Sequence, residues 1–243
     1  MKNVILLFIL SLSIFAQTIT FKSLDGLKIT ADLYIKDKNY SKPFIILFHQ
    51  AGWSRGEYKE IAPKLNNLGF NVMAVDLRSG GEINGVVNHT HQEALFEDKP
   101  TSYLDAIQDI VASIKYAKKH YAKGKLIIWG SSYSASLVIY VASKYPNLVD
   151  GVVSFSPGEY FVKYGKDKHW IEKSASKLKV PIFIASSAME KDRWIAIYKK
   201  ISSKKSSFTP KSGGEHGARN LWSKFKTSKL YWNELEKFLK QFN

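Results

Sequence analysis

Short, uninterrupted apolar runs alternate along this chain with segments of helical periodicity, and this alternation restricts the fold more than any other feature. The runs have the length and composition of strands that are buried on both faces. They span residues 44–48, 71–75, 125–129, 151–155 and 181–185. Apolar residues recur at helical spacing in the segments between and after them, at 57–68, 101–121, 134–145, 192–201 and 228–242. Alternating strands and helices predict an α/β fold with a mostly parallel, doubly wound sheet.

A hairpin is expected ahead of this pattern. Residues 18–22 and 28–35 alternate between apolar and polar on either side of Asp25-Gly26, a dipeptide typical of tight turns between antiparallel strands. A short last strand is expected at 206–209. A chain of 243 residues can bury a sizeable core in one α/β domain, and no Pro/Gly-rich linker divides it. We therefore predict a single domain over residues 17–243.

The first sixteen residues are organised like a secretory signal peptide. Lys2 precedes an apolar run at 4–10, and Ala16-Gln17 is a suitable cleavage point. The run is too short to span a bilayer, which takes about 20 residues. We predict a cleaved signal at residues 1–16 and a secreted or periplasmic protein without a stable membrane anchor. The alternative is an uncleaved N-terminal anchor or a buried strand.

The chain is strongly basic, with 36 Lys and Arg against 21 Asp and Glu and a formal net charge of +15. Between Lys163 and Lys240 there are 19 basic and 7 acidic residues, so +12 of the excess lies in the last third. Such a surface attracts anionic glycans, membranes or nucleic acid. Only four of the basic residues are arginines, and no basic run is interleaved with stacking aromatics. A solvated lysine surface that does not bind nucleic acid is the better interpretation.

The chemistry of the chain is indicated first by Gly130-Ser131-Ser132-Tyr133-Ser134. This segment directly follows a predicted strand and directly precedes a predicted helix, which is the context of a nucleophile elbow. The residues two positions before and after the nucleophile must be small, as Gly130 and Ser134 are. Ser132 is therefore the predicted nucleophile, and a serine-rich helix cap is the alternative. Cysteine is absent, so a thiol nucleophile, disulfides and Cys-based metal sites are excluded.

An acyl-transfer enzyme also needs two backbone N–H groups that point at the developing oxyanion. One belongs to the residue after the nucleophile, Tyr133. The other is expected in His49-Gln50-Ala51-Gly52, the loop that ends the first long strand, where Ala51 has the best position. His49 is predicted to hold this loop rather than to take part in the reaction. The alternative for the segment is a simple tight turn.

The acid and the base are expected after the nucleophile, in the order Ser, acid, His. His169 and His216 both follow Ser132, and His216 is favoured because it lies in a flexible glycine-containing loop before the last helix. The acid belongs in the loop after residues 181–185. Glu190 is favoured there and Asp192 is the rival, while either carboxylate is alternatively a helix N-terminal charge.

On these residues the chain resembles the α/β-hydrolase family, in particular its small dienelactone-hydrolase-like and serine-aminopeptidase-like members. The resemblance covers nearly the whole chain after the signal and rests on residues 48–52 and 75–81, the Ser132 elbow and Glu215-His216-Gly217. It implies a Ser-His-acid triad that hydrolyses esters, thioesters or small amides without a cofactor. The chain departs from the family pattern where serine or glutamine replaces glycine, at Gln50, Ser134 and Ser187.

Two long connections are expected to wall the site, residues 77–100 and 157–179. The second has room for a short helix at most, so no large lid is predicted. The first contains His89 and His91, but no third ligand has recognisable spacing, so a pocket wall or polar loop is favoured over a metal site.

We therefore predict a secreted serine hydrolase that cleaves a carboxylic ester with a small or exposed acyl group through an acyl-enzyme intermediate. The substrate is expected to be a small-molecule or glycan-linked ester, with no cofactor and no metal. Two alternatives remain open. One is a serine peptidase or amidase with the same triad, and the other is a non-catalytic binding protein with the same fold.

Overall fold

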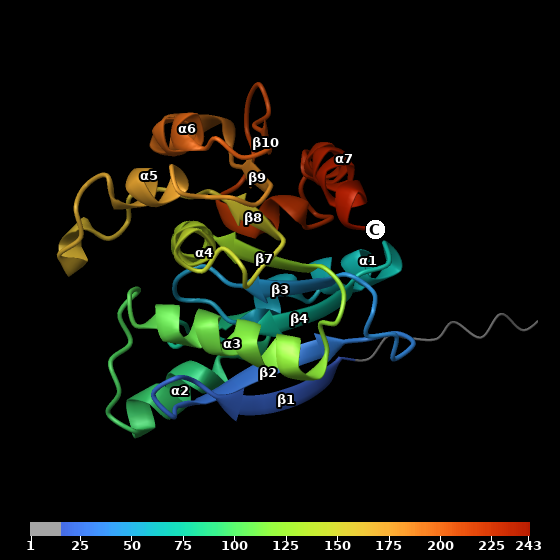
Figure 1. Ribbon diagram of the computed structural model, residues 1–243, viewed down its shortest axis with the longest axis vertical. Helices are drawn as coiled ribbons and strands as arrows, with labels where there is room; N and C mark the ends of the chain where they lie inside the picture. The colour runs from blue at the N-terminus through green and yellow to red at the C-terminus, as the bar shows by residue number, and fades with distance from the viewer. Residues whose placement is uncertain (1–15) are drawn as a thin grey trace, which may run out of the picture.

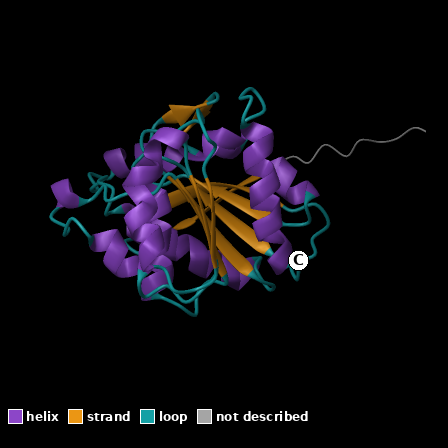
Figure 2. Cartoon of the chain, turned by 90° about the horizontal axis from the view of Figure 1, so that it is seen from above, coloured by secondary structure: helices purple, strands orange, loops and turns teal. Residues whose placement is uncertain are grey.

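The computed structural model describes residues 16–243, in which helices cover both faces of one central sheet (Figures 1 and 2). The eight strands have the order β1-β2-β4-β3-β7-β8-β9-β10. They are β1 (Gln17–Lys22), β2 (Lys28–Tyr34), β3 (Phe44–Phe48), β4 (Asn71–Val75), β7 (Leu126–Ser131), β8 (Gly151–Phe155), β9 (Ile182–Ala185) and β10 (Lys205–Phe208). Pairings of β2 are antiparallel and all others in this sheet are parallel. The predicted mostly parallel sheet with an antiparallel N-terminal hairpin is confirmed.

The inner strands are buried because each consists of an uninterrupted apolar run. All five residues of β3 and all five of β4 are buried, as a strand covered on both faces requires. Alternate residues enter two separate cores, so that Ile46 packs into one and Ile45 into the other. Between β1 and β2 the chain turns at Gly26, whose φ of 85° suits glycine. Of the predicted signal at residues 1–16, only Ala16 is among the described residues.

The described residues contain seven α-helices. They are α1 (Ile61–Asn67), α2 (His89–Phe96), α3 (Ala106–His120), α4 (Tyr133–Lys144), α5 (Trp170–Ala175), α6 (Lys191–Lys200) and α7 (Ser228–Leu239). Residues of α3, α4, α5 and α6 pack into the core that contains Ile46, and residues of α1 and α7 pack into the core that contains Ile45. This division gives the two helical layers on either side of the sheet (Figure 2).

The connection at 77–100 has more structure than the sequence led us to expect. It contains a small hairpin, β5 (Glu82–Ile83) and β6 (Val86–Val87), followed by α2. Asn84-Gly85 makes the hairpin turn with positive φ at both residues, and the Asn88 side chain caps α2 by accepting a hydrogen bond from the His91 N–H. Of the two interpretations of this segment, a pocket wall or a polar loop, the simple loop was therefore wrong, although Asn-Gly is a hairpin signal.

The other long connection is as compact as predicted. Within residues 157–179 the only α-helix is α5, preceded by a single 3₁₀ turn at Val162–Tyr164. No large lid lies over the carboxyl ends of the parallel strands in the described part of the chain. Those strand ends, toward the left in Figure 1, carry the loops that contain the predicted catalytic residues.

Candidate active site

Ser132 forms the whole turn between a strand and a helix. β7 ends at Ser131 and α4 begins at Tyr133, and Ser132 between them has φ 60° and ψ −121°. A serine in this region of backbone space costs of order 1–3 kcal/mol, so the surrounding structure must enforce it. A Cβ on Gly130 would collide with the backbone of Ser134, which explains the need for glycine there. These features are those of a nucleophile elbow.

Ser134 is accommodated where the family pattern has glycine because its hydroxyl is fully hydrogen-bonded. Its Oγ accepts from the Ser131 N–H at 2.8 Å and donates to the Phe48 carbonyl at 2.8 Å. The second bond ties the elbow to the end of β3, where the predicted oxyanion loop begins. The serine at this position therefore joins two parts of the candidate site.

His216 and Glu190 are brought together by the folding of two distant loops. His216 precedes a 3₁₀ helix at Gly217–Leu221, and its Nδ1 is hydrogen-bonded to Glu190 Oε1. The other oxygen of Glu190 accepts hydrogen bonds from the hydroxyls of Ser156, at 2.8 Å, and Ser187, at 2.9 Å. The carboxylate is thus fixed in orientation and almost buried, as a residue that orients an imidazole should be.

The two rival residues lie elsewhere. His169 is half exposed and its Nδ1 lies 2.8 Å from Glu172 Oε1. Asp192 is exposed on the first turn of α6 and takes part in no ion pair among residues 16–243. The structure therefore brings Glu190, and not Asp192, to His216.

His216 is carried to the elbow by the residues that follow it. The Gly217 N–H donates to Ser156 Oγ and the Ala218 N–H donates to Ser131 Oγ, each at 2.9 Å. Ser131 directly precedes Ser132, so these two contacts dock the segment around His216 (the histidine loop, residues 215–218) against the turn that contains Ser132. Among the described residues the Ser132 hydroxyl has no hydrogen bond to His216, a contact that often forms only when substrate is bound.

His49 holds the predicted oxyanion loop, as expected. Its Nδ1 lies 2.7 Å from the Gln50 carbonyl, and its Nε2 accepts from the Leu77 N–H at 2.8 Å. Burial lowers the pKa of His49 to about 4, so the ring stays neutral. The N–H groups of Ala51 and Tyr133 donate to no acceptor within residues 16–243 and are available to an oxyanion.

The pKa of Glu190 is lowered to about 2. Burial alone would raise it, but the hydrogen bond and charge of His216 and the hydroxyls of Ser156 and Ser187 outweigh that effect. The carboxylate is therefore ionised at neutral pH. Sequence reasoning missed Ser156, because nothing in the local pattern links residue 156 to residue 190. Ser187 was noted only as a departure from the family pattern, although Ser-x-x-Glu over residues 187–190 is the local signal of a capping box.

Sequence reasoning also missed Glu57, a fully buried carboxylate behind the elbow. It lies in a 3₁₀ helix at Arg55–Tyr58 and accepts hydrogen bonds from Ser131 Oγ, at 2.7 Å, and from the Gln50 N–H, at 2.8 Å. Burial raises its pKa to about 7, although both hydrogen bonds oppose the shift. The sequence offers no signal that singles it out, because Glu60 also follows the predicted oxyanion loop closely and is only partly buried.

An aromatic cluster lies beside Tyr133. The Tyr103 ring stacks on Tyr133 with centroids 4.5 Å apart, and the Tyr164 ring lies 5.3 Å from Tyr103. Lys163 Nζ lies 5.0 Å from the centroids of both Tyr103 and Tyr164. The second predicted wall therefore meets the segment just after the first wall, at Tyr103.

The histidines of the first wall are engaged within the protein. His91 Nδ1 lies 2.6 Å from the Arg78 carbonyl and His89 Nδ1 lies 3.2 Å from Gln92 Oε1. The described residues contain no group of three or more side chains that could hold a metal ion.

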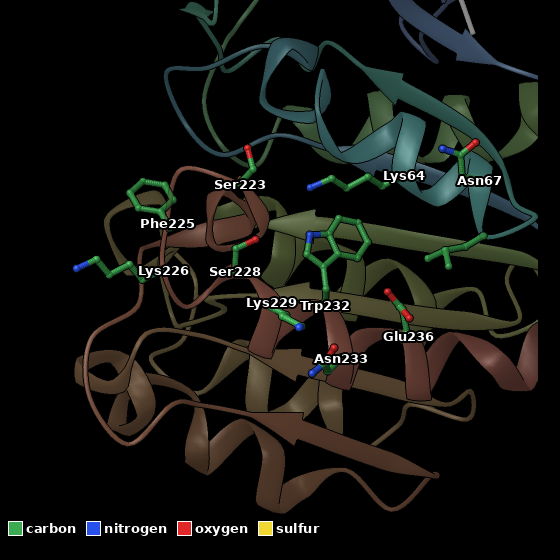
Figure 3. A pocket seen from close by; sticks show the side chains of 11 residues that line it. Lys64, Asn67, Ser223, Phe225, Lys226, Ser228, Lys229, Trp232, Asn233 and Glu236 are labelled. Atoms are coloured by element: carbon green, nitrogen blue, oxygen red, sulfur yellow. The ribbon is translucent and has the colours of Figure 1, made fainter. Parts of the chain in front are cut away.

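A groove of about 620 Å³ lies between α1 and α7, with Trp232 at its centre and Lys64 above it (Figure 3). None of the predicted catalytic residues lines this groove.

Comparison with known families adds an independent observation. The family model described as serine aminopeptidase, S33, matches residues 40–178, which is more than half of the chain. The chain belongs to this family. It is thus a hydrolase with the α/β-hydrolase fold, as the resemblance implied. In the described part of this S33-family hydrolase, every helix is too short or too polar to cross a membrane.

Curated relatives of the S33-family hydrolase include two from very different sources. A monoglyceride lipase homolog of Monkeypox virus is 28% identical over 124 residues, covering 51% of this chain and 41% of the viral protein. The matched region is thus about two fifths of that relative's length. A putative carboxymethylenebutenolidase of Aquifex aeolicus is 27% identical over 184 residues, covering 74% of this chain and 73% of the relative.

Solved structures show the same fold at low sequence identity. A dienelactone hydrolase from Anabaena variabilis superposes with a TM-score of 0.70 at 13% identity, covering 93% of this chain and 98% of that one. A Pyrococcus furiosus esterase has a TM-score of 0.69 at 19% identity, covering 94% and 93%. These likenesses concern the fold and leave the chemistry to the site itself.

Proposed function

We propose that this hydrolase cleaves carboxylic esters with Ser132 as nucleophile, His216 as general base and Glu190 as the acid of the triad. The observation that carries the proposal is the hydrogen bond between Glu190 and His216, on a loop that is docked against the Ser132 elbow. The names of the lipase-like and esterase relatives support ester cleavage. The signal-like pattern of residues 1–16 supports action outside the cytoplasm.

In the first half of the reaction, His216 Nε2 removes the proton from Ser132 Oγ as the oxygen attacks the ester carbonyl. The oxyanion accepts hydrogen bonds from the N–H groups of Ala51 and Tyr133 at the N-terminus of α4. Glu190 holds the Nδ1–H tautomer and stabilises the imidazolium. His216 then protonates the departing alcohol, which leaves an acyl group on Ser132.

In the second half, water replaces the alcohol. His216 takes a proton from the water, whose oxygen attacks the acyl carbon, and the same two N–H groups stabilise the second oxyanion. Collapse returns the proton to Ser132 and releases the carboxylic acid. The ionised Glu190, with its pKa lowered to about 2, supports both imidazolium states at neutral pH.

A fluorophosphonate probe followed by peptide mapping tests this proposal. The wild-type protein should be labelled on Ser132, and Ser132→Ala should lose both labelling and hydrolysis of p-nitrophenyl acetate by several orders of magnitude. Label on Ser134 instead would move the nucleophile. A folded wild-type protein that takes no label would support the non-catalytic binding protein.

We also propose a compact acyl group, because no large lid covers the strand ends in the described residues. Each further buried methylene would contribute about 0.8 kcal/mol only if a deep apolar channel existed. Acetyl and butyryl p-nitrophenyl esters should therefore react faster than the octanoyl ester, and a rate that climbs with chain length would contradict this. Amino-acid p-nitroanilides test the second candidate, a peptidase, which the description of the family model favours.

A further inference from the structure

Two serines bridge the histidine loop to two different carboxylates. Ser156 Oγ accepts from the Gly217 N–H and donates to Glu190. Ser131 Oγ accepts from the next amide, that of Ala218, and donates to Glu57. The first bridge belongs to the proposed triad. The second bridge has the same pattern but ends on Glu57, a carboxylate that the proposed reaction does not use.

Glu57 is buried without a countercharge. Its side chain is fully inaccessible, and none of the ion pairs within residues 16–243 includes it. Its partners are the hydroxyl of Ser131 and the N–H of Gln50. A buried carboxylate without a cation is costly, and an apolar or amide side chain of similar size would avoid that cost. The position therefore calls for an explanation beyond packing.

The partners of Glu57 supply that explanation. Gln50 directly precedes Ala51, the proposed oxyanion donor, and Ser131 directly precedes Ser132. Through Ser131 the carboxylate also holds Ala218, two residues after His216. One side chain thus joins the three segments that carry the oxyanion donor, the nucleophile and the base.

We propose that Glu57 is a positioning residue that keeps these three segments in register, an inference that rests on the proposed ester hydrolysis. The contact is tight, because a Cβ on Gly217 would collide with Ser131 Oγ and lie 3.0 Å from Gln50 Oε1. The loop therefore has little freedom to settle elsewhere while Ser131 and Glu57 hold it. Misplacement of a catalytic group by about 1 Å can cost about a hundredfold in rate.

Two substitutions and their combination test this role. Glu57→Gln keeps the volume of the side chain and one oxygen that can accept from the Gln50 N–H. It replaces the other oxygen with an NH₂ group, so the Ser131 hydroxyl loses its acceptor. Ser131→Ala removes the bridge and leaves the carboxylate. Each should lower kcat by about 10- to 100-fold with KM changed by less than about threefold, because alignment and not substrate binding is lost. The double variant should be no slower than the slower single variant, since the two residues act as one unit.

The measurement is kcat per active site, with sites counted by fluorophosphonate titration so that misfolded protein does not contribute. Glu60→Gln is the matched control, because this nearby carboxylate is partly exposed and contacts Lys64 and the Ser223 N–H outside the site. It should retain wild-type kcat and KM. Asp109→Asn removes a buried carboxylate paired with Arg78 and controls for loss of stability alone. It should lower the melting temperature, without the selective loss of kcat at nearly constant KM that is expected for Glu57→Gln.

The inference is overturned if Glu57→Gln keeps wild-type kcat per titrated site, or if the losses in the two single variants multiply in the double variant. Should Glu57→Gln fail to fold, Ser131→Ala alone decides by the same kcat criterion. Failure of the proposed function looks different, because the wild-type protein itself would then neither take the probe nor hydrolyse the ester.

Discussion

Glu190 and Glu57 are both buried beside the histidine loop, and both accept a hydrogen bond from a serine that bridges to this loop, yet their acidities differ in opposite directions. Burial raises the pKa of Glu57 to about 7. Burial acts on Glu190 too, but the hydrogen bond from His216 and its charge bring the pKa down to about 2. Glu190 is hydrogen-bonded directly to His216 and accepts a second hydroxyl, from Ser187, whereas Glu57 has neither contact, so these contacts and not the serine bridge account for the difference in pKa. Glu190 is therefore ionised at neutral pH, whereas the role proposed for Glu57 is to position the segments that it contacts.

The largest effect should come from breaking the charged side of this comparison. Glu190→Gln should lower kcat by about 10⁴-fold, because the amide can no longer select the Nδ1–H tautomer or stabilise the imidazolium. Asp192→Asn is the control and should cost less than about threefold, since Asp192 is exposed and outside the site. Initial rates on p-nitrophenyl acetate measure both. Small and equal losses in the two variants would place the acid elsewhere.

The bridging serines should show a smaller difference. Ser156→Ala leaves Glu190 with His216 and Ser187, whereas Ser131→Ala leaves Glu57 with the Gln50 N–H alone. We expect about a tenfold loss of kcat for Ser156→Ala, less than for Ser131→Ala. Both leave a buried N–H of the histidine loop without a partner, which costs about 1–3 kcal/mol, so thermal unfolding should report similar destabilisation. A Ser156→Ala variant slower than Ser131→Ala would reverse the comparison.

The two carboxylates should also affect stability in different pH ranges. The folded state raises the pKa of Glu57 from 4.5 to about 7 and so binds its proton more tightly, which means that its contribution to stability is lost as pH rises through that range. For Glu190 the folded pKa is depressed, so its contribution is present above pH 4.5 and is lost as pH falls toward 2.

Urea unfolding of wild-type and Glu57→Gln protein at pH 4.5, 6 and 8 measures this difference. The variant should gain stability relative to wild type as pH rises. The ionisable groups that face Glu57 are His216, Tyr58 and Tyr133, and burial raises the pKa of both tyrosines well above 10, so neither contributes in this range. Parallel curves for the two proteins would mean that Glu57 is ionised throughout.

The smallest effect concerns a charge that only Glu190 has nearby. Arg193 Nη1 lies 3.7 Å from Glu190 Oε1, and the arginine side chain is 62% exposed. An ion pair so exposed contributes about 0–1 kcal/mol and weakens with salt. Arg193→Gln should therefore change kcat/KM by less than about threefold. The change should disappear in 0.5 M salt, where the screening length is only about 4 Å. A loss of a hundredfold would make Arg193 part of the site.

The fold could be predicted from the sequence more completely than the candidate site. Each inner strand is indicated by its own apolar run, and the Ser132 elbow lies within five consecutive residues, so both can be recognised from local sequence. The choice between Glu190 and Asp192 is not local, because it depends on which carboxylate meets a histidine 26 positions away from Glu190. The bridge from Glu57 to Ser131 spans 74 positions and that from Ser131 to Ala218 spans 87. Hydrophobic periodicity carries no information about such contacts, because they form only when the loops at the edge of the sheet pack together.

The backbone of Ser132 has a consequence for how such a protein changes over time. A left-handed conformation at a serine lowers the stability of the fold, and glycine at the same position would relieve it at the expense of the hydroxyl. A lineage selected for folding alone should therefore drift toward glycine at 132. Thermostability screens without an activity filter should therefore enrich glycine at this position.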